Sequence, residues 1–153
     1  MEATAVVVSI LLLAACLCLG YLAFRRVRLM RGGGVDVCLR RRPAAGSRVQ
    51  SRDAAAGWHF GVARYRGNEL AWFRLTSLRP GPSVVVDRMD LEIVDRRTPD
   101  GAEAYVIPPA ASVLRCRVQG VELELAMGPG VLTGFQSWLE SAPPGRTGYR
   151  QAS

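Results

Sequence analysis

The sequence predicts a mainly β protein. An N-terminal transmembrane helix precedes a small antiparallel β-sandwich or barrel of about seven strands, which one C-terminal amphipathic helix caps. Three features predict this order: a long uncharged apolar run at the N-terminus, short runs in which apolar and polar residues alternate, and a final run with apolar residues at helical spacing. The 153 residues, of which 49% are hydrophobic and 22% charged, suffice for one folded domain beside the helix.

The first predicted element is the membrane-spanning helix. Residues 3–24 carry no charge, and a helix of that length, rising about 1.5 Å per residue, crosses a hydrocarbon core of roughly 30 Å. An uncleaved anchor is preferred over a secretory signal, because the N-terminus has no basic residue and the run leads into arginines. The alternative is a lipoprotein signal ending at Leu13-Ala14-Ala15-Cys16, in which Cys16 is lipidated.

Charge predicts the orientation of this helix. All 20 basic residues are arginines, and nine of them lie in residues 25–52 against one acidic residue, Asp36. The net charge of +7 comes from this segment, because residues 53–153 contain as many acidic residues as arginines. The positive-inside rule therefore predicts a single-pass protein of the cell membrane with its N-terminus outside and its C-terminal domain in the cytoplasm. In that reducing compartment, Cys38 and Cys116 are expected to be free apolar fillers.

The segment after the helix contains a glycine triplet, Gly32 to Gly34, which predicts a flexible joint. Residues 35–39 alternate as a first strand, and residues 43–57 are rich in small and polar side chains, as in a loop. The predicted organisation is residues 1–24 as the transmembrane helix with a short outer N-terminus, 25–34 as a basic juxtamembrane segment and glycine hinge, 35–142 as the β domain, and 143–153 as a flexible tail.

A β-hairpin is predicted from residues 58–65 and 69–75, which flank a two-residue Gly67-Asn68 turn. Opposite charges meet beside the turn, and four apolar side chains share one face of the hairpin. A slip of one residue would move that set to the other side, so the pattern fixes the register. The expected pairs are Arg66 with Glu69, Val62 with Phe73, and Phe60 with Leu75.

The second hairpin, in residues 114–125 with Gln119-Gly120 at its turn, is the strongest local signal. One face is wholly apolar, and the other carries two cross-strand ion pairs that contribute about 0.2–1 kcal/mol each. The expected pairs are Val118 with Val121, Arg117 with Glu122, Cys116 with Leu123, Arg115 with Glu124, and Leu114 with Leu125.

Between the hairpins, residues 84–86 and 89–93 alternate as strands, residues 98–101 form a turn, and residues 104–107 are predicted as a short strand ended by two prolines. After residue 130 the apolar spacing becomes helical. This helix is expected to plug the core and to end at Pro143-Pro144-Gly145. Its apolar positions are Val131, Phe135, Trp138, Leu139 and Ala142.

This order of elements resembles the pleckstrin-homology superfold over residues 35–142. Trp138 occupies the place in the terminal helix where that superfold commonly has a core tryptophan. The resemblance rests on the layout of strands and helix, and a shared fold does not imply a shared function. It implies a pleckstrin-homology-like soluble domain.

At family level the chain resembles an uncharacterised actinobacterial family of small single-pass membrane proteins. That family is a domain of unknown function whose genes often lie near those of ATP synthase. The residues that carry the resemblance are Phe24-Arg25-Arg26, Trp58-His59-Phe60-Gly61, Leu70-Ala71-Trp72-Phe73 and the ending Phe135-Gln136-Ser137-Trp138-Leu139. The resemblance implies a location at the membrane and specifies no chemistry.

No catalytic, metal or cofactor site is predicted, so we expect no enzyme and no small-molecule substrate. The one histidine, His59, has no nucleophile motif beside it, and the glycine triplet lacks the lysine and hydroxyl of a phosphate loop. The nearly alternating carboxylates fit the solvent face of a strand better than a cation site. They are Asp87, Asp90, Glu92 and Asp95.

A nucleic-acid partner is disfavoured, because the basic residues lie close to the membrane and are not interleaved with aromatic residues. Two other functions remain. The preferred function is a non-catalytic binding or scaffold module on the cytoplasmic face. It would recruit or stabilise an unknown membrane-associated protein partner through a sheet edge or a groove beside the C-terminal helix.

The alternative function is a sensor of anionic lipid headgroups in the bilayer, although the simplest interpretation of the arginines is that they only set topology. The candidate lipid contacts are Arg25, Arg26, Arg28, Arg31, Arg40, Arg41, Arg42, Arg64 and Arg66.

Overall fold

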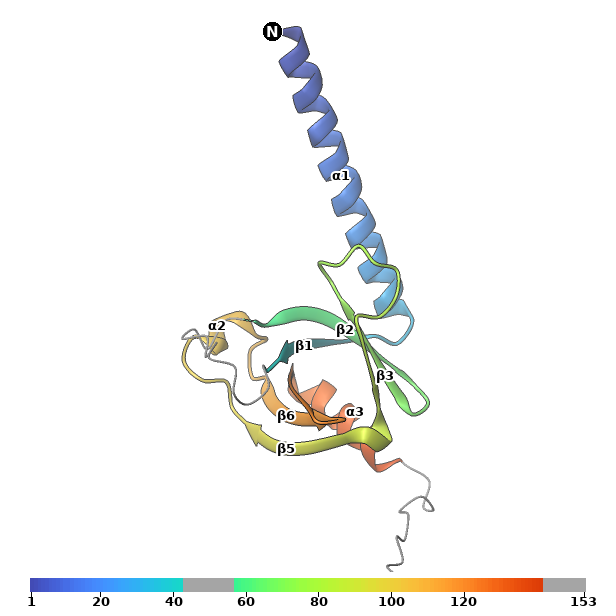
Figure 1. The fold of residues 1–153 in the computed structure, drawn as a ribbon, viewed down its shortest axis with the longest axis vertical. Coiled ribbons are helices and arrows are strands. Elements are labelled where there is room, and N and C mark those ends of the chain that lie inside the picture. Colours follow the sequence, from blue (N-terminus) through green and yellow to red (C-terminus); the bar gives the residue numbers. More distant parts are fainter. Residues whose placement is uncertain (43–56, 142–153) are drawn as a thin grey trace, which may run out of the picture.

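The computed structural model describes residues 1–42 and 57–141, in which a long N-terminal helix leads into a curled β-sheet (Figure 1). The predicted tail, 143–153, and most of the predicted loop, 43–57, lie outside the described residues. The elements are α1 (Glu2–Arg31), β1 (Val35–Arg41), β2 (His59–Arg66), β3 (Glu69–Arg74), β4 (Val84–Asp87), the 3-10 helix η1 (Arg88–Asp90), β5 (Leu91–Arg97), α2 (Glu103–Val106), β6 (Ser112–Val118), β7 (Val121–Met127) and α3 (Pro129–Glu140).

The described strands form one seven-stranded sheet in the order β4-β3-β2-β1-β7-β6-β5. Every neighbouring pair is antiparallel. The sheet curls into a half-barrel around α3, which lies on the concave face (Figure 1). The predicted fold class is confirmed: a mainly β domain, an N-terminal apolar helix and a short C-terminal helix. This layout is consistent with the pleckstrin-homology-like arrangement that the sequence predicts.

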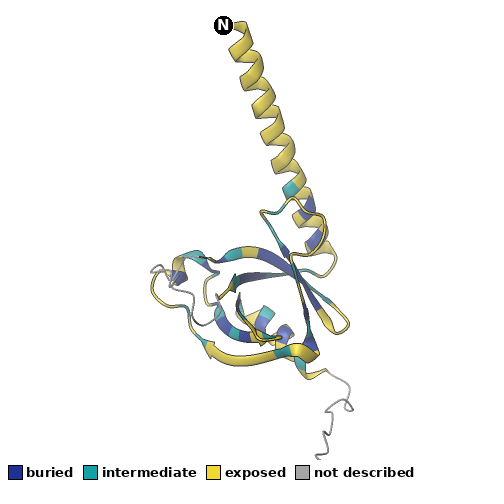
Figure 2. Ribbon diagram, in the orientation of Figure 1, coloured by how far each residue is buried: buried dark blue, intermediate teal, exposed yellow. Residues whose placement is uncertain are grey.

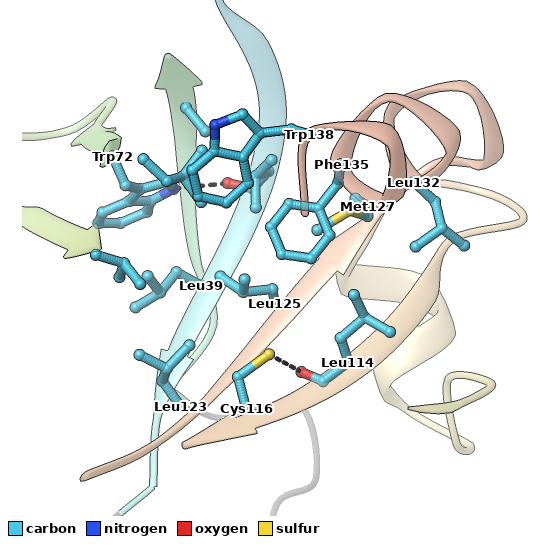
Figure 3. Packing of buried hydrophobic residues seen from close by; sticks show 14 residues of the cluster. Leu39, Trp72, Leu114, Cys116, Leu123, Leu125, Met127, Leu132, Phe135 and Trp138 are labelled. Atoms are coloured by element: carbon cyan, nitrogen blue, oxygen red, sulfur yellow. Dashed lines mark hydrogen bonds between the residues drawn. The ribbon is translucent and has the colours of Figure 1, made fainter. Parts of the chain in front are cut away.

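The main core lies between the concave face of the sheet and α3 (Figure 3). Phe135 and Trp138 of α3 are buried against the strands, as the helical spacing predicts. The Trp138 indole N–H donates to the carbonyl of Gly67 at 2.8 Å, and that of Trp72 donates to the carbonyl of Val37, also at 2.8 Å. Each buried indole therefore satisfies its one polar group while its rings fill the core.

Both predicted hairpins form in the predicted register. In the first hairpin, Val62 and Phe73 face the convex side of the sheet, where Leu29 of α1 covers them. The residues that alternate with them, including Trp72, face the main core. This part of the sheet is buried on both faces, and a period of two cannot identify which face meets the main core.

The elements differ from the prediction in three main places. Residues 89 and 90, expected as the start of a strand, belong to the 3-10 helix η1. Residues 104–107 were expected as a strand, but Glu103–Val106 form a helical turn, α2, closed by a hydrogen bond from Ile107 N to Glu103 O at 3.0 Å. The physical reason is that the Glu103 side chain is buried in a cluster of ion pairs, which fixes a turn there. Strand β5 continues to Arg97, beyond the predicted end at residue 93, after a register shift between Ile93 and Asp95.

Helix α1 projects away from the sheet and is exposed along most of its length (Figure 2). Among residues 1–42 and 57–141, it is the one helix long and apolar enough to cross a membrane. Its buried positions, Arg25 and Leu29, lie near its C-terminal end, where it meets the sheet.

Candidate functional site

The junction between α1 and the sheet is a packed contact. Leu29, 7% exposed, lies against Val62, Ala71 and Phe73 on the convex face of β2 and β3. Gly34 passes so close that a Cβ there would lie 2.5 Å from the Val62 Cγ1 and 2.6 Å from the Leu29 carbonyl oxygen. The glycines predicted as a hinge therefore form a tight turn, which sets the angle at which the helix leaves the domain.

Arg25 adds a polar contact to this junction. It is 8% exposed, and its Nη1 donates to the carbonyl oxygens of Arg74 at 2.9 Å and of Ser77 at 2.6 Å. No carboxylate forms an ion pair with Arg25 among the residues that the structure describes, and its buried Nη2 has no hydrogen-bond acceptor there. Arg25 therefore holds the connection after β3 against the helix, one residue beyond the apolar run.

The predicted lipid contacts near this junction have different environments. Arg26 lies 3.4 Å from Asp36 in a half-exposed ion pair, whereas Arg28 and Arg31 are exposed on α1. Arg64 of β2 is partly buried beside Gly32, where its guanidinium occupies the space a Cβ would need. The base of α1 thus gathers several of the predicted arginines.

The remaining predicted contacts lie elsewhere. Arg66 is exposed at the turn between β2 and β3. Arg41 and Arg42 are exposed at the end of β1 that lies away from α1, and Arg40, beside them, points into a buried cluster. The nine candidate lipid contacts therefore lie at three places: the base of α1, the turn between β2 and β3, and the far end of β1.

That cluster, called here the buried ion cluster, consists of Arg40, Arg97, Glu103 and Glu124. Glu103 and Glu124 are only 2% and 1% exposed. Arg40 contacts both carboxylates: its Nε lies 2.7 Å from Glu124 Oε2 and its Nη2 lies 2.9 Å from Glu103 Oε1. Arg97 reaches the same two residues, at 2.6 and 3.0 Å to Glu103 and 3.2 Å to Glu124.

The surroundings complete the cluster. The Arg40 guanidinium carbon lies 4.7 Å from the ring centroid of Trp58, whose indole N–H donates to Glu103 at 3.4 Å. The backbone N–H of Asp100 donates to Glu103 Oε2 at 3.1 Å. Burial acts to raise the pKa of Glu103, but the hydrogen bonds from Arg97 and Asp100 and the charges of Arg97 and Arg40 lower it to about 2.

This arrangement is a structural tie. Two guanidinium groups balance two carboxylates, and every carboxylate oxygen accepts at least one hydrogen bond or ion pair. The cluster joins β1, β5, β7 and α2 on the side of the sheet opposite to α3, next to a second apolar cluster around Trp58. A buried, fully satisfied network of this kind specifies one arrangement of the elements that it connects.

Sequence reasoning missed this cluster. It assigned Arg40 to the candidate lipid contacts and Glu124 to an ion pair with Arg115. Arg115 does lie opposite Glu124 in the register, but no ion pair joins the two among the described residues, because Glu124 binds Arg40 and Arg97. The other predicted pair, Arg117 with Glu122, forms at 3.6 Å. The sequence did contain a signal. Arg40 and Glu124 each alternate along their strands with residues of the main core, so both side chains lie on the opposite face of the sheet.

The other titratable groups have structural environments. His59 begins β2, where partial burial and the nearby charge of Arg74 lower its pKa. Asp87 caps η1 by accepting from the Met89 N–H at 2.8 Å, and Asp90 accepts from Gln119, also at 2.8 Å. In the described ranges, 1–42 and 57–141, no three His, Cys, Asp or Glu side chains gather as a metal site would require.

These features define a class: a small curled β domain carried on a long apolar N-terminal helix. The chain belongs to the family described as "Protein of unknown function (DUF2550)", which matches residues 11–145. It is 37% identical over 149 residues to an uncharacterized protein of Mycobacterium tuberculosis strain H37Rv, covering 95% of this chain and 93% of that protein. An uncharacterized protein of Mycobacterium leprae is 38% identical over 149 residues, which again cover 95% of this chain and 93% of that protein. The family resemblance predicted from the sequence is thereby confirmed.

Proposed function

We propose that this protein is anchored in the cell membrane by α1 and that its β domain is a non-catalytic binding module on the cytoplasmic face. The observation that carries the proposal is the packed junction, in which Leu29 and Arg25 fix the base of α1 to β2 and β3. A domain attached in this way presents the same surface to the cytoplasm at all times, as a binding module at a membrane requires.

The charge distribution supports the orientation. Arg26, Arg28 and Arg31 follow the apolar run within seven residues and are exposed on the last two turns of α1. Basic residues within about 15–20 positions of a membrane helix favour the cytoplasmic side. Among residues 1–24 the one charged side chain is that of Glu2.

The role of the buried carboxylates supports binding over catalysis. Glu103 and Glu124 are the most buried acidic residues described, and their oxygens are occupied by hydrogen bonds from Arg40, Arg97, Trp58 and the Asp100 backbone. A general acid or base must exchange a proton with a substrate, and groups saturated in this way serve the fold instead.

The proposed partner is a protein segment that adds to the edge of β5. This strand is last in the sheet order and exposes the apolar side chains Ile93 and Val94, at 41% and 42%. An extended segment can pair with such an edge through backbone hydrogen bonds and cover the apolar side chains.

Photo-crosslinking in native membranes tests this proposal. A benzophenone amino acid at position 94 is expected to give a defined protein adduct identifiable by mass spectrometry. The matched control is position 121, at the start of β7, whose valine is similarly exposed at 54%. Adducts of the same identity and yield at both positions, or no protein adduct at position 94, would contradict the proposal.

The second candidate function is recognition of anionic lipid. Arg28 and Arg31 favour it, because both are exposed at the base of α1 and take part in no ion pair among the described residues. Each arginine close to an anionic leaflet adds about 1 kcal/mol to the free energy of membrane binding, and salt weakens this attraction.

Thermal unfolding of the full chain in nanodiscs tests this candidate. Anionic phosphatidylglycerol should raise the Tm relative to phosphatidylcholine in a salt-dependent way. The Arg28→Ala/Arg31→Ala variant should lose most of that increase, and Arg117→Ala, on exposed β6 surface, should keep it. A Tm independent of lipid charge would remove this function.

A further inference from the structure

The connection between β3 and β4, residues 75–83, extends beside the base of α1 (Figure 1). Its position is fixed by Arg25, whose Nη1 donates to Ser77 O at 2.6 Å and to Arg74 O at 2.9 Å. Arg25 is the first charged residue after the apolar run that ends at Phe24. The connection therefore lies at the level where the apolar part of the helix ends.

We propose that this connection is a second membrane-contacting element, in which Leu78 enters the boundary between headgroups and acyl chains. Arg79 then faces the lipid phosphates. The inference rests on the proposed function in one respect only, that α1 spans the bilayer. It does not depend on the protein partner at β5.

The depth of the connection follows from the helix. If residues 3–24 fill the hydrocarbon core, Arg25 lies at its edge, inside an interfacial layer about 5–8 Å thick. Ser77 is in hydrogen-bond contact with the Arg25 guanidinium, so the next residue, Leu78, lies in the same layer. Leu78 is 58% exposed in the structure, and an apolar side chain at this level gains by entering the acyl region.

The backbone of the connection suits this environment. Pro80 and Pro82 have no N–H to desolvate. The Arg79 N–H donates to Ser77 Oγ at 3.2 Å, and the Ser83 N–H donates to the Trp72 carbonyl at 2.8 Å. Most N–H groups of the segment are thus absent or satisfied, which lowers the cost of placing a loop among headgroups.

The charges point to a phosphate. Arg25 is more than nine-tenths buried and donates to carbonyl oxygens of the connection, so its guanidinium holds the connection in place. Arg79 is exposed on the connection, two residues beyond Ser77. The exposed guanidinium of Arg79, next in sequence to the exposed apolar side chain of Leu78, fits the layered chemistry of a phospholipid surface, in which phosphate lies directly outside the acyl chains.

Tryptophan fluorescence of the full chain in phosphatidylcholine–phosphatidylglycerol nanodiscs tests the proposal. Leu78→Trp is compared with Met89→Trp, whose native side chain is similarly exposed at 54% in η1. Met89 lies in η1, which leads directly into β5, and Figure 1 shows β5 on the side of the sheet far from α1. The three native tryptophans are buried in the domain and contribute equally to both variants.

With lipids brominated near the carbonyl end of the acyl chains, Leu78→Trp emission should be blue-shifted and lose intensity, whereas Met89→Trp emission should be unchanged. Arg79→Ala in the Leu78→Trp background should reduce the loss. Tyr21→Trp, inside the apolar run, serves as the positive control for insertion of α1. Quenching of Tyr21→Trp without quenching of Leu78→Trp would overturn the inference, and failure of both would instead contradict the membrane-spanning role of α1.

Discussion

Arg40 of β1 and Glu124 of β7 lie opposite each other on paired strands, and their side chains form a buried ion pair with Nε to Oε2 at 2.7 Å. Glu124 is 1% exposed. The pair lies at the middle of the sheet order, where β1 joins the first hairpin to the second. With Arg97 and Glu103, it ties together strands that come from opposite ends of the domain sequence.

Removing the Glu124 charge should destabilise the domain strongly. In Glu124→Gln, two partly buried arginines share one carboxylate, and breaking a buried pair in this way costs about 3–5 kcal/mol. Urea unfolding of the full chain in detergent micelles measures the loss. The matched control, Glu122→Gln on the same strand, breaks only a partly exposed 3.6 Å pair with Arg117 and should cost less than about 1 kcal/mol. Equal losses in the two variants would show that the buried ion cluster is not a structural tie.

Acid should weaken the same cluster. The pKa of Glu103 is lowered to about 2 from an ordinary value of 4.5, so its contribution is complete above about pH 4.5 and is lost as the pH falls towards 2. A pKa shift of this size corresponds to a contribution of about 3 kcal/mol to the free energy of unfolding.

Thermal unfolding from pH 7 to pH 2 measures this effect. Glu103→Gln should be less stable than the native chain at pH 7, and the gap in Tm should narrow below pH 4.5. A gap that stays constant down to pH 2 would contradict the role of the Glu103 carboxylate.

The tight turn at the junction should not tolerate a side chain. A Cβ at Gly34 would lie 2.6 Å from the Leu29 carbonyl oxygen, a backbone atom that cannot rotate away. Gly34→Ala should therefore cost about 1–3 kcal/mol, typical of overpacking. Trypsin cleavage at Arg25, which the junction buries, should become faster in detergent.

Gly134→Ala is the control for the junction. Gly134 lies inside α3, and a Cβ there meets nothing within 4 Å. Because alanine favours a helix over glycine by about 1 kcal/mol, this variant should be neutral or slightly more stable. Cleavage at Arg25 that is unchanged by Gly34→Ala would show that the junction is not held by this contact.

The two cysteines of the domain should be unreactive in the folded chain. Burial raises the pKa of Cys116 to about 12, and burial with the nearby charge of Asp36 raises that of Cys38 to about 11. Both thiols are free and at most 3% exposed. Maleimide labelling at pH 8, followed by peptide mass spectrometry, should modify neither site until urea unfolds the domain. Rapid native labelling of Cys116 would contradict the core packing.

The parts of the fold that depend on neighbouring residues were predictable. Both hairpin registers follow from short turns and a period of two, because a slip by one residue would exchange the faces. The helix α3 was predictable because Phe135 and Trp138 recur at helical spacing. Each of these signals lies within a stretch of 16 residues or fewer, such as 60–75 for the first hairpin.

The parts that depend on distant contacts were not predictable. Arg40 and Glu124 meet across 84 positions of sequence. Arg97 joins them because a register shift in β5 changes the face of the sheet on which its side chain lies. Residues 104–107 alternate like a strand, but the buried Glu103 side chain holds a helical turn. The contacts of Arg25 with the carbonyls of Arg74 and Ser77 were not predictable either, because they join residues 49 and 52 positions apart.

Protease protection in intact cells tests the central claim most directly, that α1 crosses the membrane and the β domain lies on its inner side. A C-terminal epitope on the full chain should resist external protease in intact cells and be digested after the membrane is opened, and the N-terminal peptide should contain residues 1–24. Digestion of the epitope in intact cells, or a mature chain that begins at Cys16, would contradict the claim.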